Sequence, residues 1–217
     1  MKIETNTLNI LKNFAKINPS ILIQEGNTLK TMSASKTIMA KAVVSTEFNK
    51  RFAIYNLDRF ISTVSMFNNP NFIFKDSYVK IEDENMESNL VYADESIITK
   101  LPEKEPKIAV VDANFKMNSE HLKLIEKAAG VLQLPEIIVA GDGKNIYLQV
   151  ADSKHSQGDN FSVNLGETDK SFKAVFKFEN IKVIPGEYEV NISSRGLAHF
   201  LGKDVEYWIA IEQSSTF

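Results

Sequence analysis

The sequence predicts an α+β protein made of two similar β-rich domains, each with two short helices packed on antiparallel sheets. Much of the chain alternates apolar and polar residues with period two, as in "YVKIE" from Tyr78 and "VEYWIAIE" from Val205. Only a few segments show helical periodicity, and the order of elements occurs twice along the chain. The 217 residues suffice for two domains, each with its own core.

The first helix is expected over residues 8–18, "LNILKNFAKIN". Apolar residues recur there at steps of three and four, which places them on one face of a helix. This inward face comprises Leu8, Leu11, Phe14 and Ala15. The opposite strip comprises Asn9, Lys12, Asn13 and Lys16, and no acid occurs between Thr5 and Gln24.

Three further helical segments are expected. The second covers residues 57–67, with Asn56 as its N-cap. The third covers residues 120–132 and places Lys123 and Lys127 on its outer side. The fourth is shortened to about residues 180–184.

The two halves follow from the repeated order of these elements. Each contains an alternating strand, a helix, a turn marked by Pro70 or Pro185, and another strand. Glycines at 26 and at 141–143 lie between alternating segments and predict hairpin turns. The segment between the two halves is charged and aperiodic and contains two prolines. We therefore expect a linker at 101–111 between domains at 1–100 and 112–217.

Composition is that of an ordinary globular protein, with 43% hydrophobic and 24% charged residues. No apolar run approaches the roughly 20 residues of a membrane helix, and the N-terminus lacks the apolar region of a signal peptide, so no membrane partner is expected. The absence of cysteine fits a reducing compartment. The formal charge of −3 is unevenly distributed, because six acids and no base occur between Glu82 and Glu95.

No catalytic or metal site is expected. "EDEN" from Glu82 lacks the glycine and the twelfth-position glutamate of a calcium loop. "GDGKN" from Gly141 lacks the Gly-Lys-Ser/Thr ending of a phosphate loop. His121, His155 and His199 share no metal-ligand spacing and form no nucleophile–base pattern. We therefore predict a protein that is not an enzyme and has no metal or cofactor.

Several segments carry a resemblance to a known family. They are "ILKNFAKIN" at 10–18, "AIYNLDRFISTVSMFNN" at 53–69, "IPGEYEV" at 184–190, and the strand "YWIAIE" followed by the tail "SSTF". Together, and in this order, they resemble the DNA sliding clamps, above all the homotrimeric clamps of T-even bacteriophages within the proliferating cell nuclear antigen superfamily. The resemblance covers essentially the whole chain, although no single segment is diagnostic.

The resemblance implies a ring in which strands form the outer layer and helices line a hole that duplex DNA threads. The cations expected at this bore are Lys12, Lys16, Arg59, Lys123, Lys127 and Lys182. The acids on the same segments are Asp58, Glu120 and Glu126. The residues alone leave a simpler interpretation open, in which the lysines solvate amphipathic helices or pair with nearby glutamates.

The resemblance also implies two protein-binding surfaces. A groove near the linker would receive the C-terminal peptide of a DNA polymerase, at positions Met32, Ile98, Leu101, Trp208 and Ala210. For Met32 and Trp208, a place in the ordinary core is an equally good interpretation. Ring closure would pair residues 89–93 with residues 160–165 of the next subunit. The interface residues would be Leu90, Val91, Tyr92, Phe161 and Val163.

The function implied is that of a processivity factor in the cytoplasm of an infected bacterium: a homotrimeric ring that encircles double-stranded DNA and tethers the replicative polymerase. A separate ATP-driven clamp loader would open it, and phage clamps also engage late transcription factors. Two alternatives stay open. One is a monomeric processivity factor that binds DNA on an open face, and the other is a β-rich structural phage protein that binds no DNA.

Overall fold

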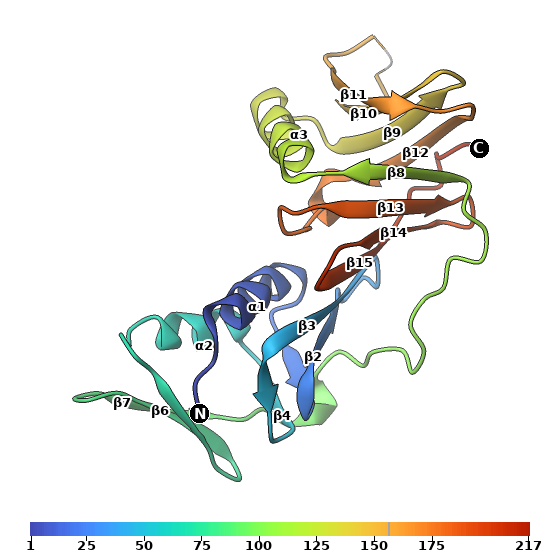
Figure 1. Ribbon diagram of the computed structural model, residues 1–217. Helices are drawn as coiled ribbons and strands as arrows, with labels where there is room; N and C mark the ends of the chain where they lie inside the picture. Colours follow the sequence, from blue (N-terminus) through green and yellow to red (C-terminus); the bar gives the residue numbers. More distant parts are fainter. Residues whose placement is uncertain (156) are drawn as a thin grey trace. The chain divides into compact units, whose positions relative to one another are not determined.

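Figure 1 shows the computed structural model, which describes residues 1–155 and 157–217. The chain divides into two compact units, Met1–Glu103 and Lys104–Phe217. Both units are built from antiparallel strands with few helices, so the expected α+β class with two β-rich domains is confirmed. The stretch expected to form the linker, residues 101–111, spans the division between the units.

The first unit contains two α-helices, α1 (Thr5–Ile17) and α2 (Leu57–Val64). Its strands are β1 (Ile21–Ile23), β2 (Gly26–Met32), β3 (Ile38–Phe48), β4 (Phe52–Ile54), β5 (Asn71–Phe74), β6 (Tyr78–Glu82) and β7 (Glu87–Val91). A 3₁₀ turn, η1 (Glu95–Ile97), follows them. Strand β1 pairs with β4, β2 pairs with β3, and β6 lies between β5 and β7.

The second unit contains one α-helix, α3 (Ser119–Leu132), and one 3₁₀ turn, η2 (Phe178–Asn180). Its strands are β8 (Ala113–Met117), β9 (Glu136–Asp142), β10 (Asn145–Ala151), β11 (Phe161–Glu167), β12 (Ser171–Lys177), β13 (Tyr188–Ser193), β14 (Leu197–Leu201) and β15 (Val205–Ala210). One sheet has the order β11-β10-β9-β12, and β8, β13, β14 and β15 are neighbours in that order. None of the helices in the described residues has the length and apolar character needed to cross a bilayer.

The repeated order in the sequence corresponds to a repeated topology. The pair β1–β4 has its counterpart in β9–β12, and the pair β2–β3 has its counterpart in β10–β11. The three-stranded run β5-β6-β7 has its counterpart in β13-β14-β15. Helix α1 precedes the first set and α3 precedes the second.

Helix α1 packs on β3 through a wider face than the sequence pattern indicated. Its buried apolar residues are Ile10, Leu11, Phe14, Ala15 and Ile17. The sequence pattern places Asn13 on the solvent-facing side of the helix, but the residue is only 7% exposed. The pattern places Leu8 on the buried face, but the residue is half-buried. Asn13 lies three residues after Ile10 and four before Ile17, so the buried stripe includes it.

Asparagines cap the other two helices, and the cap of α2 is the predicted Asn56. Asn56 Oδ1 accepts a hydrogen bond from the backbone N–H of Arg59 at 2.8 Å. Asn118 Oδ1 accepts from the backbone N–H groups of Glu120 and His121, each at 3.0 Å. Both asparagines thus satisfy donors that the first helical turn leaves unpaired.

The expected fourth helix at residues 180–184 is wrong, because that segment contains only the end of η2. Ile181, Val183 and Ile184 are β-branched, and Pro185 disfavours helical geometry at the residue before it. The loop is instead held by two tyrosines: Tyr188 donates its hydroxyl to Ile184 O at 2.7 Å, and the Ile184 N–H donates to the Tyr207 hydroxyl at 3.2 Å. Burial raises the pKa of Tyr188 to about 12.

The strand edges differ in how they are covered. The C-terminal tail pairs with β12 through Thr216 and Lys173, and the Phe217 ring stacks on Phe172 with centroids 6.1 Å apart. At the opposite side of that sheet, β11 has β10 as its only strand neighbour among the described residues. Strand β7 is likewise an edge strand, with β6 on one side. Each of these two edges is therefore available for pairing with another chain.

Candidate nucleic-acid and protein interfaces

The cations of the first unit lie on two adjacent helices. Lys12 and Lys16 are exposed one turn apart on α1, and Arg59 is exposed in the first turn of α2, which packs against α1. The exposed row of α1 also contains Asn9 and has no acid. Two adjacent helices thus present fixed positive charges to solvent, which suits contact with a polyanion.

The expected cations of the second unit differ in their surroundings and in their exposure. Lys123 and Lys127 are exposed on α3, where Glu120 and Glu126 are also exposed. Lys182 is half-buried in the loop after η2, so it does not belong to a helix as the sequence suggested. The DNA-binding assignments of all six cations stay predictions, and Lys182 has the weakest geometric basis.

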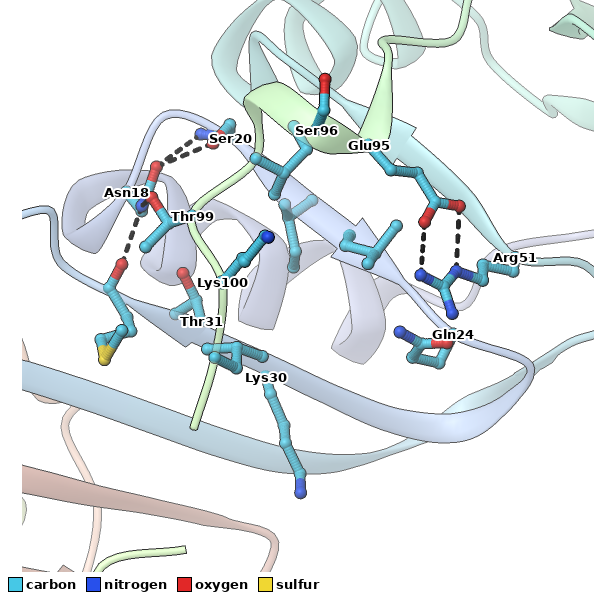
Figure 2. Close-up of a pocket in the computed structure, with 15 residues that line it drawn as sticks. Asn18, Ser20, Gln24, Lys30, Thr31, Arg51, Glu95, Ser96, Thr99 and Lys100 are labelled. Atoms are coloured by element: carbon cyan, nitrogen blue, oxygen red, sulfur yellow. Dashed lines mark hydrogen bonds and ion pairs between the residues drawn. The ribbon is translucent and has the colours of Figure 1, made fainter. Parts of the chain in front are cut away.

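A pocket of about 450 Å³ opens in the first unit between β1, β2, η1 and the chain after it (Figure 2). It brings together three of the residues expected in the peptide groove, Met32, Ile98 and Leu101. Met32 and Ile98 are buried, and Leu101 is half-buried. An apolar floor with polar groups at the rim is the usual composition of a ligand pocket.

Asn18 holds the walls of this pocket together (Figure 2). Its Nδ2 donates to Met32 O at 2.7 Å and to Thr99 Oγ1 at 2.9 Å. Its Oδ1 accepts from the backbone N–H of Ser20 at 2.9 Å and from the Ser20 hydroxyl at 3.1 Å. One amide therefore joins the end of α1, the end of β2 and the segment after η1. No sequence pattern indicated this role, because the partners are separated by up to 81 residues.

We expect Asn18→Ala to lower the free energy of unfolding of the first unit. Asn18 is only 4% exposed, and its loss leaves Met32 O without this donor, which costs about 2–3 kcal/mol. Urea denaturation followed by circular dichroism measures the change. Asn9→Ala, at an exposed position of the same helix, is the control and should stay within about 0.5 kcal/mol of wild type. Equal stability of the two variants would contradict the role assigned to Asn18.

A second contact braces the same wall. The Arg51 guanidinium makes a bidentate ion pair with the Glu95 carboxylate of η1, through Nε to Oε1 at 2.9 Å and through Nη2 to Oε2 (Figure 2). The hydrogen bond to Glu95 raises the pKa of Arg51 above its ordinary value. The carboxylate of Asp94 caps η1 by accepting from the Ser96 N–H at 2.8 Å. Hydrogen bonds from the Ser96 side chain and from this N–H lower the pKa of Asp94.

The other two residues expected in the groove belong to the second unit. Trp208 on β15 is buried, and its ring stacks on His199 with centroids 4.7 Å apart and planes 8° apart. His199 Nε2 lies 2.8 Å from the Glu206 carboxylate. Ala210 is half-buried at the end of β15. The assignment of Trp208 and Ala210 to the groove stays a prediction.

The expected interface residues lie on or beside the edge strands β7 and β11. Leu90 and Val91 are on β7, and Tyr92 directly follows it, so the strand ends earlier than the expected range of 89–93. Val91 is 79% exposed. The Tyr92 hydroxyl oxygen is buried without a hydrogen-bond partner among the described residues, and burial raises the pKa of Tyr92 to about 12. Phe161 and Val163 are half-buried on β11.

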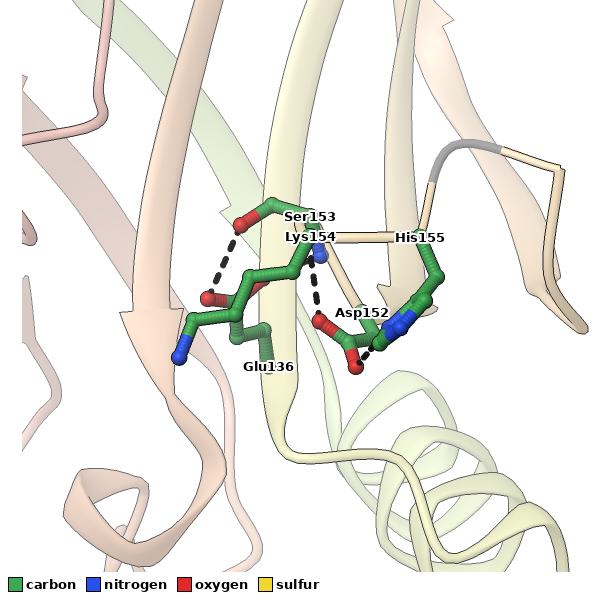
Figure 3. Close-up of polar contacts among 5 residues, drawn as sticks. All are labelled: Glu136, Asp152, Ser153, Lys154 and His155. Carbon is green, nitrogen blue, oxygen red and sulfur yellow. Dashed lines mark hydrogen bonds and ion pairs between the residues drawn. The ribbon is translucent and has the colours of Figure 1, made fainter.

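A polar cluster lies where β9 begins and β10 ends (Figure 3). Ser153 Oγ donates to Glu136 Oε1 at 3.0 Å, whereas His155 Nδ1 pairs with Asp152 Oδ2 at 2.8 Å. The hydroxyl is thus bonded to a carboxylate and not to a histidine, which is not the geometry of an activated serine. Across the described residues, no three His, Cys, Asp or Glu side chains are placed to hold a metal ion.

The chain is similar in sequence to known sliding clamps of phages. Residues 114–213 match the family described as the gp45 sliding clamp, C-terminal. The chain is 32% identical to the sliding clamp of Vibrio phage KVP40, over 98% of this chain and 99% of that protein. It is 32% identical to the sliding clamp of Escherichia phage RB69 and 30% identical to that of Enterobacteria phage T4, each over 100% of this chain and 99% of the other.

Solved structures share the fold at much lower identity. One is the proliferating cell nuclear antigen of A. fulgidus bound to the C-terminal region of FEN-1, with a TM-score of 0.71, 15% identity and 96% of each chain covered. Another is the proliferating cell nuclear antigen of Entamoeba histolytica, with a TM-score of 0.70, 16% identity and 94% of each chain covered. A third is the Helicobacter pylori beta clamp, with a TM-score of 0.67, 14% identity, 96% of this chain and 62% of that chain.

Proposed function

Because the chain belongs to the sliding-clamp family of T4-like phages, we propose that it encircles double-stranded DNA as a homotrimeric ring and tethers the replicative polymerase to its template. It acts in DNA replication inside the infected bacterial cell, in the cytoplasm. The ring confers processivity by retention and carries out no chemical step itself.

The exposed, acid-free row of Lys12 and Lys16 on α1 is the observation that carries the DNA-binding part of this proposal. Duplex DNA presents one negative charge per about 1.7 Å of its axis, so such a row meets a nearly uniform series of phosphates. Contacts with phosphates position a protein without reading sequence. Lysine side chains are flexible point charges, which permits exchange between neighbouring phosphates as the ring slides.

The free edges of β7 and β11 support ring closure by pairing of β7 with β11 of the next copy. Large apolar side chains are exposed beside both edges. Val91 lies on β7, and Val131, which is 72% exposed, lies on α3, the helix that packs against β11. A head-to-tail contact of this kind is heterologous and closes into a ring when its rotation allows.

The partners follow from the same proposal. The pocket of the first unit would receive a hydrophobic peptide from the C-terminus of the polymerase. A separate ATP-driven clamp loader would open the ring, and late transcription factors would dock on the same protein.

The experiment that tests the proposal compares retention on circular and linear DNA. The mass in solution, measured by light scattering, should be three times the 24.4 kDa of one chain. After loading by the clamp loader of the same phage, the protein should stay on nicked circular DNA through gel filtration and be lost once a single cut linearises the circle. A monomeric mass, with equal retention on linear and circular DNA, would favour a monomer that binds DNA on an open face. Failure to associate with either DNA would contradict both the ring and the open DNA-binding face.

A further inference from the structure

We infer that the pocket of the first unit recognises a carboxylate on the partner peptide, and that Lys100 makes this contact beside an apolar floor. The inference deepens the proposed function and rests on it, since it assumes that this pocket receives the tail of a partner. It adds the chemical feature that the peptide must carry.

The charge of the pocket is the first observation. Its lining contains three cations, Lys30, Arg51 and Lys100, and one acid, Glu95. The cavity beside β7 contains one cation, Arg59, and three other cavities in the described residues contain more acids than bases. A chain with a formal charge of −3 therefore concentrates positive charge at this pocket.

The distribution of ion pairs is the second observation. Glu95, the acid of the lining, is engaged by both guanidinium contacts of Arg51 (Figure 2). Lys100 is exposed and has no carboxylate within ion-pair distance among the described residues. Its ammonium group is thus available to an incoming anion, whereas Arg51 is held as part of the wall.

The apolar floor is the third observation. Met32, Ile98, Ile21 and Leu101 line the pocket, whose volume of about 450 Å³ suits one or two side chains. At the free C-terminus of a peptide, a carboxylate lies directly beside the last side chain. A terminal apolar residue would place its side chain on this floor and its carboxylate near the rim. An acidic side chain close to an apolar one would offer the same chemistry.

The size of the effect follows from the exposure of Lys100. An exposed ion pair is worth little, but a charge-assisted hydrogen bond beside an apolar contact is stronger. We therefore expect the loss of either the carboxylate or the ammonium group to weaken binding about three- to tenfold. High salt should reduce this difference, because exposed charges are screened.

The probe is a fluorescein-labelled synthetic peptide of the C-terminal residues of the same phage's DNA polymerase, made with a free carboxylate or a carboxamide. A third peptide keeps the free carboxylate and replaces each acidic side chain by its amide. Binding is measured by fluorescence anisotropy with wild type, Lys100→Gln and Lys100→Glu. Lys75→Gln is the control, since it removes an exposed lysine elsewhere in the same unit.

Wild type and Lys75→Gln should bind the carboxylate form about three- to tenfold tighter than the form that lacks it. In Lys100→Gln the difference should vanish, and in Lys100→Glu it should reverse. A difference that appears only with the third peptide assigns the carboxylate to a side chain. Equal binding of all three peptides to wild type would overturn the inference while leaving the proposed function intact. Failure of every peptide to bind would overturn the docking itself.

Discussion

Val91→Asp is expected to convert the trimer into monomers. Val91 is 79% exposed on the edge strand β7, and pairing with β11 of another copy would bury it. A carboxylate buried without a partner costs several kcal/mol, which is enough to dissociate a ring at micromolar concentration. Light scattering across a concentration series measures the mass. Val163→Asp on β11 should have the same effect from the other side of the contact.

The controls separate loss of assembly from loss of folding. Val43→Asp places the same charge at an exposed valine of β3 and should leave the mass unchanged. Val163 pairs with Leu148 on the inner side of its sheet, so circular dichroism must show that Val163→Asp is folded. A trimer of unchanged mass in both Val91→Asp and Val163→Asp would rule out the β7–β11 contact.

Local sequence patterns predicted most of the fold because the signals are local. Helical spacing located α1 and α3, and Asn56 located the start of α2. The glycine turns were also predictable from local sequence. Gly26 and Gly143 have φ angles of 99° and 85°, which residues with a side chain rarely adopt. The missing fourth helix was the exception, because tertiary hydrogen bonds from Tyr188 and Tyr207 hold that loop instead.

The pocket was only partly predictable. Met32, Ile98 and Leu101 could be named from the family resemblance, but the contacts that shape the pocket are long-range. Arg51 and Glu95 are 44 residues apart, and neither belongs to a recognisable motif. Periodicity assigns a residue to a face of its own element and carries no information about such partners.

Periodicity also could not predict which strands lie at the edge of a sheet. An alternating strand has the same pattern whether its neighbour belongs to the same chain or to another one. Only the pairing order shows that β7 and β11 are each paired on one side. The sequence therefore suggested which segments are strands, and the structure shows that β7 and β11 each have an unpaired side.

Lys12→Glu combined with Lys123→Glu is expected to abolish clamp function without changing assembly. Both lysines are exposed on helices, so neither substitution removes a core contact. The double change lowers the formal charge of the chain from −3 by four, and a ring applies it three times around the bore. Each lost phosphate contact removes favourable counterion release, and each new carboxylate repels the duplex. Retention on nicked circular DNA should fall at least about tenfold.

The matched control variant has the same net charge as the helix variant, but its two substitutions lie outside the helices. Lys75→Glu combined with Lys154→Glu changes one exposed lysine in each unit outside the helices, so the formal charge falls by the same amount. If the helices line the bore, the control variant should support near wild-type processivity in primer extension with the phage polymerase, and the helix variant should extend primers no further than polymerase alone. Equal losses would mean that net charge alone matters, and wild-type activity in the helix variant would mean that Lys12 and Lys123 do not face DNA.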